Sequence, residues 1–334
     1  MNKKEKKSAV IGRLIKITVF LCICVILWEG FTWLLYPRGP RRGMMSPDAA
    51  AFRNYKESHI DVYVVGNSDA YAGFSPMELW KSSGITSYVS GEPVQTLASA
   101  EYLISEFLND KSPKYIFLET DEVFTGKSAE LDLIRARADE QFPLIKYHNY
   151  WKTVNYGTFR HMPENYRPYA MGQSIRTQTV PYTGGDYMTI NDSDPSKNSI
   201  MSANTVKYLD MIRKDCENYG CTLVLLNVPC AKSWSNSRHN SVEQYAEKYG
   251  IDYLDLNTCT RQLDFNWATD TSDGGEHLNV SGAAKVSHYI GKYLENKGVK
   301  DKRDSAQYAQ WQKRYKKYLT KIKNNKDKAP LVIK

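Results

Sequence analysis

The feature that most constrains the fold is a regular alternation of short apolar runs and longer amphipathic segments. The apolar runs are rich in β-branched residues and predict strands at 60–65, 85–89, 114–118, 222–228 and 253–256. The amphipathic segments predict helices at 76–83, 96–109, 203–219, 241–249 and 281–295. Strands separated by helices favour parallel pairing with right-handed crossovers. We therefore expect an α/β fold, a three-layer α/β/α sandwich with a five-stranded parallel sheet.

The first predicted strand ends in Gly66-Asn67-Ser68-Asp69. Loops at the carboxyl edge of a parallel sheet line the ligand crevice, so Ser68 can meet groups from other strand ends. A serine becomes a nucleophile only when a base takes its proton, and histidine titrates near the working pH. The same residues also suit a plain strand-to-loop turn, since Gly, Asn and Ser are all turn residues.

The partner that Ser68 requires is His277, which precedes the last predicted helix. Asp273 is the nearest acid that can hold the far ring nitrogen, while Asp270 and Glu276 stay open as alternatives. Backbone N–H groups near Ser68 and Gly91 can hold a developing oxyanion. The alternative interpretation is that His277 is a residue at the start of a helix whose side chain hydrogen-bonds to the backbone. We predict Ser68, His277 and Asp273 as a catalytic triad.

At these residues the chain resembles the SGNH (GDSL-like) hydrolase superfamily over about residues 58–298. The matching blocks are Gly66-Asn67-Ser68-Asp69, Ser90-Gly91, and Asp273 to His277 with Leu278-Asn279 and Gly282-Ala283 following. The resemblance implies a flavodoxin-like sandwich, Ser68 as nucleophile, His277 as base and Gly91 as oxyanion donor.

Three positions depart from that family pattern. Asn67 stands where the family has aspartate, and Glu119-Thr120-Asp121 replaces the Gly-x-Asn-Asp block that supplies an asparagine oxyanion donor. Gly274 occupies the usual place of the acid, three residues before the histidine. Asp273 lies one residue further back.

The amino-terminal region combines a basic segment, 1–16, with an apolar stretch, 17–36, long enough to cross a bilayer as one helix. The positive flank predicts a cytoplasmic amino terminus and an extracellular body, on a single-pass cell-membrane protein. A cleaved signal peptide is the alternative, but the stretch is long and Leu34-Leu35-Tyr36-Pro37 offers no small-x-small site. Glu29 within the stretch either reaches the interface or meets a membrane partner.

The remaining organisation follows from composition. We predict a linker at 37–58, an extracellular domain at 59–298 with a long irregular insertion at 125–200, and a basic amphipathic tail at 299–334. His148 in the insertion is either a packed residue or a substrate contact. Helical spacing in the tail predicts one face, whose members either pack onto the domain or lie on a membrane: Tyr308, Trp311, Tyr315, Leu319 and Ile322.

Charge and cysteine content narrow the partners. Residues 1–42 carry a net charge of +7 and residues 299–334 carry +9, so the body of a chain whose total is +8 carries −8. A basic groove is therefore not expected on the body, which argues against nucleic acid. Four cysteines lie outside the apolar stretch without a C-x-x-C or Cys/His pattern, so we expect no metal site and no cofactor.

Within that superfamily, a chain with an amino-terminal anchor and a long insertion most resembles the members that act on cell-envelope polymers. These are the teichoic acid D-alanylation protein and polysaccharide O-acetyltransferase types, which work beside a membrane-bound O-acyltransferase. The first hypothesis is a membrane-anchored serine acyltransferase or esterase acting on a cell-envelope glycopolymer. A secreted-type carbohydrate esterase and a non-catalytic scaffold for a membrane O-acyltransferase are the alternatives.

Overall fold

The computed structural model describes residues 3–35, 49, 51–57, 59–124, 131–142, 144, 169–188 and 201–326. The chain divides into two compact units, one made of residues 1–41 and 134–166 and the other of residues 42–133 and 167–334.

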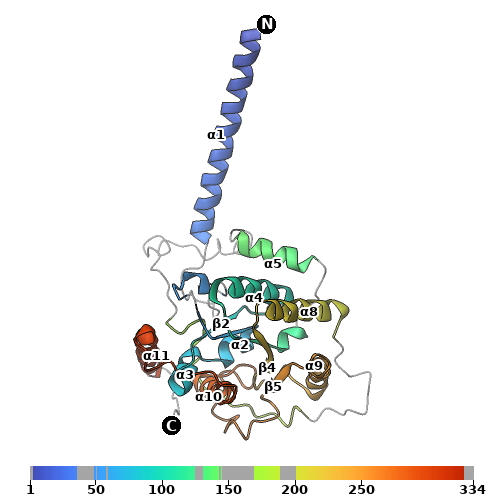
Figure 1. Ribbon diagram of the computed structural model, residues 1–334, viewed down its shortest axis with the longest axis vertical. Coiled ribbons are helices and arrows are strands. Elements are labelled where there is room, and N and C mark those ends of the chain that lie inside the picture. The colour runs from blue at the N-terminus through green and yellow to red at the C-terminus, as the bar shows by residue number, and fades with distance from the viewer. Residues whose placement is uncertain are drawn as a thin grey trace. The chain divides into compact units, whose positions relative to one another are not determined.

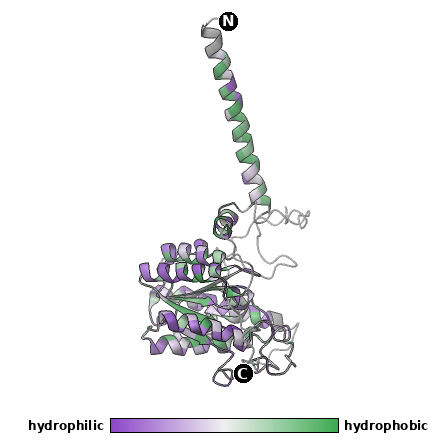
Figure 2. Ribbon diagram, turned by 90° about the vertical axis from the view of Figure 1, so that its right-hand side faces the viewer, coloured by the Kyte–Doolittle hydropathy of each residue, from purple (hydrophilic) through white to green (hydrophobic). Residues whose placement is uncertain are grey.

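The first unit contains the helix α1 (Lys3–Leu35), which is apolar along most of its length (Figure 2). Its stretch Ser8–Leu34 has 27 residues and a mean hydropathy of 2.5 over an 18-residue window, so it is long and apolar enough for a membrane span or a signal sequence. At about 1.5 Å per residue it measures about 40 Å, more than the ~30 Å of a bilayer's hydrocarbon core.

The second unit is built on a five-stranded sheet whose order is β2-β1-β3-β4-β5 (Figure 1). All four neighbouring pairs are parallel. The strands are β1 (Val62–Gly66), β2 (Ser87–Gly91), β3 (Tyr115–Glu119), β4 (Thr222–Asn227) and β5 (Asp252–Asp255). The predicted α/β class with five parallel strands is confirmed.

Alternate residues of β1 enter two different cores. Tyr63 and Val65 belong to a cluster that includes Leu103 of the helix α4 (Leu97–Lys111) and Leu209 of the helix α8 (Ala203–Asn218). Val62 and Val64 lie in a second cluster with Ile290 of the helix α10 (Val280–Asn296). Both faces of the sheet are therefore covered, as a parallel sheet requires.

The helices of this unit form the two outer layers, with α4 and α8 on one side of the sheet and α3 and α10 on the other (Figure 1). They are α2 (Ser68–Gly73), α3 (Pro76–Ser83), α4 (Leu97–Lys111), α8 (Ala203–Asn218), α9 (Asn236–Tyr249), α10 (Val280–Asn296) and α11 (Ala309–Lys326). Helix α5 (Asp132–Gln141) belongs mostly to the first unit. Short 3₁₀ turns lie at η1 (Ala51–Asn54), η2 (Asp121–Val123) and η5 (Ala306–Tyr308).

Two predicted boundaries are wrong. Helix α9 begins at Asn236 rather than at 241, because the Ser235 side chain accepts a hydrogen bond from Arg238 N and caps the helix earlier. The predicted linker also reaches too far into the domain. Phe52 and Tyr55, placed in the linker, are buried in the core, so the folded domain begins before residue 59.

The predicted irregular insertion holds one regular element among its described residues. Helix α5 (Asp132–Gln141) forms there because its sequence, DLIRARADEQ, consists mostly of good helix formers. The described residues 169–188 contain neither helix nor strand, as predicted. His148 lies outside the described residues.

The tail docks onto the domain through α11. Trp311 and Ile322 are buried and α11 contacts α3, which confirms the packing alternative for this face. Leu319, however, is 44 % exposed, while Tyr318 is fully buried. The buried residues Trp311, Tyr318 and Ile322, together with the partly buried Tyr315, follow a spacing of four, three and four residues. The packed face of α11 therefore includes position 318 and leaves 319 outside it.

Candidate active site

Ser68 is placed by the end of strand β1. The strand ends at Gly66, and Ser68 is the first residue of the helix α2. The sequence had predicted a loop at this position. Asn67 caps this helix, because its side chain accepts a hydrogen bond from Asp69 N at 2.8 Å. Ser68 itself is partly exposed. Its side chain therefore starts at the carboxyl edge of the sheet, where ligands meet parallel sheets.

Two glycines allow the ends of β1 and β2 to approach closely next to Ser68. Gly66 pairs with Gly91 across the two strands. A Cβ at Gly91 would lie 2.4 Å from the carbonyl oxygen of Gly66, and one at Gly66 would lie 2.5 Å from the Cβ of Glu119. Glycine is thus the residue that fits at both places. That the N–H groups of Ser68 and Gly91 bind an oxyanion stays a prediction.

His277 is held by Asp273 through two contacts. Its ring Nδ1 lies 2.5 Å from Oδ2 of Asp273, and its backbone N–H donates to Oδ1 at 2.8 Å. The intervening Gly274 and Gly275 have φ of 78° and 100°, a left-handed conformation that favours glycine. Asp273 lies four residues before His277, whereas the SGNH (GDSL-like) pattern has its acid three residues before the histidine. This tight loop accommodates the extra residue. Asn279 then caps α10 by accepting from Ser281 N.

The electrostatics of this pair keep the carboxyl group of Asp273 ionised. Burial alone would raise the pKa of Asp273, but the hydrogen bonds from His277 and the charge of Arg176 outweigh it and hold the pKa down to about 2. An ionised Asp273 accepts from Nδ1, so Nδ1 bears the hydrogen and Nε2 of the neutral ring bears a lone pair. Nε2 is buried and has no hydrogen-bond partner among the described residues. It is the atom that can accept a proton.

The other two acids that the sequence left open make different contacts. Asp270 is fully buried, forms an ion pair with Lys285 at 2.8 Å and accepts from Ser281 Oγ at 2.7 Å. It therefore ties the loop to the start of α10. Glu276 is exposed. Of the three, Asp273 is the one whose carboxylate pairs with the ring of His277.

Arg176 is a member of the site that sequence reasoning missed. Its side chain is 7 % exposed, and its terminal nitrogen lies 3.3 Å from Oδ2 of Asp273. Val280 N donates to its backbone carbonyl at 2.9 Å, which fixes the segment 169–188 against the start of α10. No periodicity or motif marks an arginine in an irregular segment, so the sequence offered no signal for it.

Tyr71 connects the serine with the Asp–His pair. Burial raises the pKa of Tyr71, while the charge of Arg176 and hydrogen bonds with the side chains of Ser68 and Arg176 lower it. Arg176 thus acts on Tyr71 by its charge, and it contacts Asp273, which in turn contacts His277. No hydrogen bond joins Ser68 directly to His277 Nε2, and catalytic hydrogen bonds are often long before substrate binds.

Carboxyl groups at the end of β3 support the turn that carries Ser68. Asp121 accepts from Asn67 Nδ2 at 2.8 Å and from Arg238 at 2.7 Å. Asp69 and Glu119 are buried beside it; burial, then the charges of neighbouring carboxylates, raises the pKa of both well above the usual range. Asp121 therefore anchors Asn67, the residue before Ser68.

One group of side chains has a composition that could ligate a metal. Ligand atoms of Asp273, Glu276 and His277 lie within 4.8 Å of one another. Ligands of one Zn²⁺ ion, at about 2.0–2.2 Å from it, lie roughly 3 Å or more apart. The 2.5 Å between Nδ1 of His277 and Oδ2 of Asp273 is instead the separation of a hydrogen-bonded pair.

No protein-family profile matches the sequence, and no curated protein matches it. Among solved structures, it is similar to a protein described as an acylhydrolase from Bacteroides fragilis, with 12 % identity and a TM-score of 0.39, over 74 % of this chain and 94 % of that one.

Two further solved structures have similar scores. A family 3 carbohydrate esterase from Clostridium thermocellum has 15 % identity and a TM-score of 0.36 over 71 % of this chain and 96 % of that one. A GDSL-like lipase from Bacteroides thetaiotaomicron has 11 % identity and a TM-score of 0.36 over 75 % and 100 %. Identities and TM-scores this low say nothing about activity, which resides in the residues of the site.

Proposed function

We propose that this chain is an SGNH-type serine acyltransferase or esterase, anchored in the membrane by α1 and acting on acyl esters of a cell-envelope glycopolymer. The observation that supports it most is the Asp273–His277 pair, whose buried Nε2 has no hydrogen-bond partner among the described residues. A neutral imidazole oriented by a carboxylate is the base that a serine nucleophile needs.

The reaction proceeds in two steps. The Ser68 hydroxyl attacks the acyl carbonyl and gives its proton to Nε2 of His277. When the tetrahedral intermediate collapses, the ester bond breaks, Nε2 returns the proton to the leaving hydroxyl, and the acyl group stays on Ser68. A polymer hydroxyl or water then attacks the acyl-enzyme, with His277 again as base. The N–H groups of Ser68 and Gly91 hold the oxyanion in both steps.

Asp273 keeps this cycle running because it stays ionised. Its low pKa, about 2, leaves it charged at every pH where His277 is a base, so it stabilises the imidazolium in each half-reaction. Arg176 contacts the same carboxylate at 3.3 Å and limits its movement. Asp273 therefore orients the ring and does not itself take up the proton.

The cellular setting follows from α1. Its apolar stretch exceeds the length of a signal-peptide core, and the basic residues before it favour a cytoplasmic amino terminus. The catalytic unit then lies outside the cell, where acyl esters on envelope glycopolymers occur. A membrane-bound O-acyltransferase is the partner that would supply the acyl group to Ser68.

The first experiment labels the full-length protein in detergent micelles with a fluorophosphonate. We expect labelling of the wild type and none of Ser68→Ala. Ser305→Ala, which removes an exposed serine elsewhere, should label like the wild type. Undiminished labelling of Ser68→Ala would refute the proposed nucleophile.

A second experiment separates transfer from hydrolysis and from a scaffold role. The protein is pre-acylated with p-nitrophenyl acetate, and the release of acetate is compared with the formation of acetylated oligosaccharide as sugar is added. Transfer predicts acetylated sugar, and a secreted-type esterase predicts acetate alone. A scaffold predicts no burst of p-nitrophenol and normal envelope acylation in cells that carry Ser68→Ala.

A further inference from the structure

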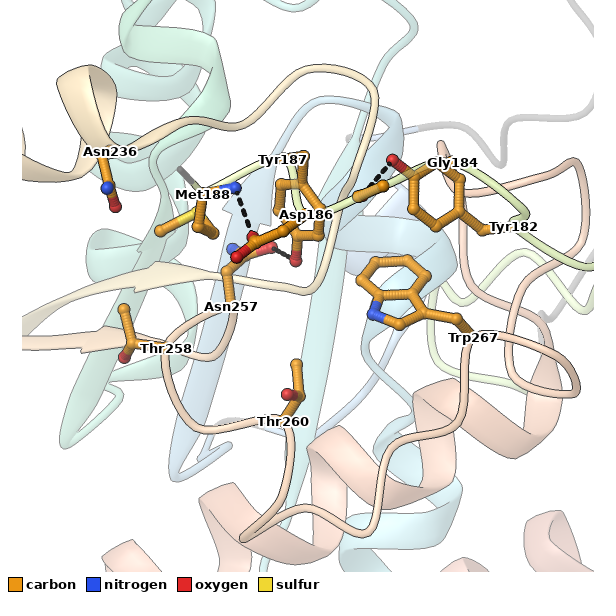
Figure 3. Close-up of a pocket in the computed structure, with 11 residues that line it drawn as sticks. Tyr182, Gly184, Asp186, Tyr187, Met188, Asn236, Asn257, Thr258, Thr260 and Trp267 are labelled. Carbon is orange, nitrogen blue, oxygen red and sulfur yellow. Dashed lines mark hydrogen bonds between the residues drawn. The ribbon is translucent and has the colours of Figure 1, made fainter. Parts of the chain in front are cut away.

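A pocket of about 570 Å³ (Figure 3) is lined in part by Tyr182, whose ring packs on Gly275 in the loop that carries His277. Its wall comes from the end of the segment 169–188, from the residues that follow β5, from Trp267 and from the start of α9. This volume is in the range of small-ligand sites, about 300–1000 Å³. None of the proposed catalytic residues lines it.

The lining combines aromatic faces with amide and hydroxyl groups. The rings of Tyr182 and Trp267 lie 5.2 Å apart and those of Tyr187 and Trp267 lie 5.4 Å apart, and all three side chains are partly exposed. Figure 3 shows Tyr182 and Trp267 on one side of the pocket and Asn236 and Thr258 on the opposite side. A sugar ring presents apolar C–H faces and equatorial hydroxyls, which match rings and polar groups arranged in this way.

The charge of the lining narrows the class of sugar. No lysine or arginine is among the eleven lining residues, and Asp186 is the one residue with a formal charge. Burial, and then the charge of Asp255 beneath the pocket, raises the pKa of the Tyr187 hydroxyl, which donates to Asn257 at 2.8 Å and so stays protonated. Among the described lining residues a phosphate or a uronate would meet no cation, whereas a neutral sugar meets donors and acceptors.

The pocket is joined to the catalytic loop by Tyr182. A Cβ on Gly275 would lie 2.7 Å from the ring of Tyr182, so the ring packs directly on the loop two residues before His277. Tyr182 N also donates to the carbonyl of Trp267 at 3.0 Å, and Gly274 N donates to that of Val180 at 3.1 Å. A ligand stacked on these rings is therefore held against the loop that positions the base.

We propose that this pocket binds a neutral pyranose unit of the glycopolymer and presents the neighbouring unit to Ser68. Binding of the sugar requires only the pocket, while presentation to Ser68 rests on the proposed function. Trp267 and Tyr187 determine specificity, Trp267 by stacking and Tyr187 by holding Asn257 with its hydroxyl. The absence of a cation selects uncharged stretches of polymer over phosphate-rich or uronate-rich ones.

The test uses full-length Ser68→Ala in detergent micelles, so that no turnover consumes the ligand. Cellotetraose, xylotetraose and chitotetraose are titrated by calorimetry, with tetragalacturonate and a glycerol-phosphate oligomer as charged comparators. We expect at least one neutral tetraose to bind at millimolar concentration or below and neither charged oligomer to bind more tightly. Trp267→Ala should weaken binding at least about tenfold, and Trp267→Phe should weaken it less.

Tyr187→Phe keeps the ring and removes the hydroxyl, so it should weaken binding by a smaller factor than Trp267→Ala. Tyr219→Ala, which removes a half-exposed ring outside the pocket, should bind as the parent does. Failure of every neutral tetraose, preference for a charged oligomer, or unchanged binding in Trp267→Ala would overturn the pocket assignment. These outcomes are independent of fluorophosphonate labelling, so the pocket and the nucleophile can each fail separately.

Discussion

The strand-end turn at Ser68 and the irregular segment 169–188 contribute to one site in different ways. The turn is held by backbone packing, since Gly66 and Gly91 leave no room for a side chain. The side chain of Asn67 also donates a hydrogen bond to Asp121 and accepts one from Asp69 N. The segment 169–188 makes no strand or helix and attaches by separate hydrogen bonds to β2, to α2, to the first residue of α10 and to the loop 267–274. The regular part holds the proposed nucleophile, and the irregular part supplies residues that orient the base and line the pocket.

This difference implies a ranking of mutational effects. Changes to the Ser68–His277–Asp273 group should remove the chemistry, whereas changes in the segment 169–188 should alter its efficiency or its substrate. Changes in elements that only complete the domain should alter stability alone. Four of the predictions below concern activity, and a different order of their measured effects would contradict this ranking.

The largest effect after loss of the nucleophile is expected for His277→Gln. Glutamine keeps a polar group of similar length but cannot take a proton from Ser68. We expect kcat/KM for p-nitrophenyl acetate to fall about 10⁴-fold or more, as for the loss of the base in a serine triad. In combination with Ser68→Ala the loss should not grow, because the two act as a unit. Additive losses would place His277 outside the reaction.

Asp273→Asn should come next, with a fall in kcat of about 10²–10⁴-fold, because an amide does not stabilise the imidazolium. Asp270→Asn is the matched control, since Asp270 pairs with Lys285 and not with His277. A larger loss of rate in Asp270→Asn than in Asp273→Asn, at equal stability, would contradict the assignment of Asp273 as the acid.

Asp273 also predicts a pH dependence of stability. Its pKa in the folded protein is about 2, below the usual 3.8, so the folded state binds the proton less readily than the unfolded state. Its contribution is therefore complete above about pH 5 and is lost as the pH falls towards 2. Urea unfolding should show wild type and Asp273→Asn converging over this range. A constant difference would contradict the low pKa.

Arg176→Met should have an intermediate effect, a fall in kcat of about 10- to 100-fold, because the carboxylate that orients His277 loses a buried contact. Arg176 is a positioning residue, so KM should change much less than kcat. Arg176→Lys keeps the charge but not the planar fork and should recover part of the rate. A change confined to KM would instead place Arg176 in substrate binding.

The smallest effect on activity is expected for Trp311→Ala in α11. Trp311 is 1 % exposed and its ring lies 5.5 Å from that of Trp80, so its loss should cost about 3–5 kcal/mol of unfolding free energy. The rate per folded molecule should remain unchanged. Leu319→Ala, at an exposed position, should change stability by less than about 0.5 kcal/mol. Loss of rate in Trp311→Ala at full folding would connect α11 with the site.

The same contrast explains what could be predicted from the sequence. The five strands were predicted because runs such as Tyr63 to Val65 are apolar on both faces, and their ends differ by up to two residues because flanking residues also have strand propensity. Leu319 was wrongly assigned to the buried face of α11 because two adjacent helical positions, 318 and 319, fit the periodicity nearly equally well.

The site was predictable where local sequence places chemistry at a strand end or a helix start. Ser68, Asp273 and His277 meet this condition. Arg176, Tyr182 and Tyr187 do not, because their positions depend on long-range contacts of a segment without periodicity. The role of Asp121 in holding Asn67 was likewise invisible, since it joins residues that lie 54 positions apart.

The central claim is that the imidazole of His277 activates the hydroxyl of Ser68. Its most direct test is mass spectrometry of peptides from full-length protein treated with a fluorophosphonate at pH 7, in the wild type and in His277→Gln. The account predicts an adduct on the peptide with Ser68 in the wild type and a rate of adduct formation at least about 10³-fold lower in the variant. An adduct on another serine, or equal rates in the two proteins, would contradict it.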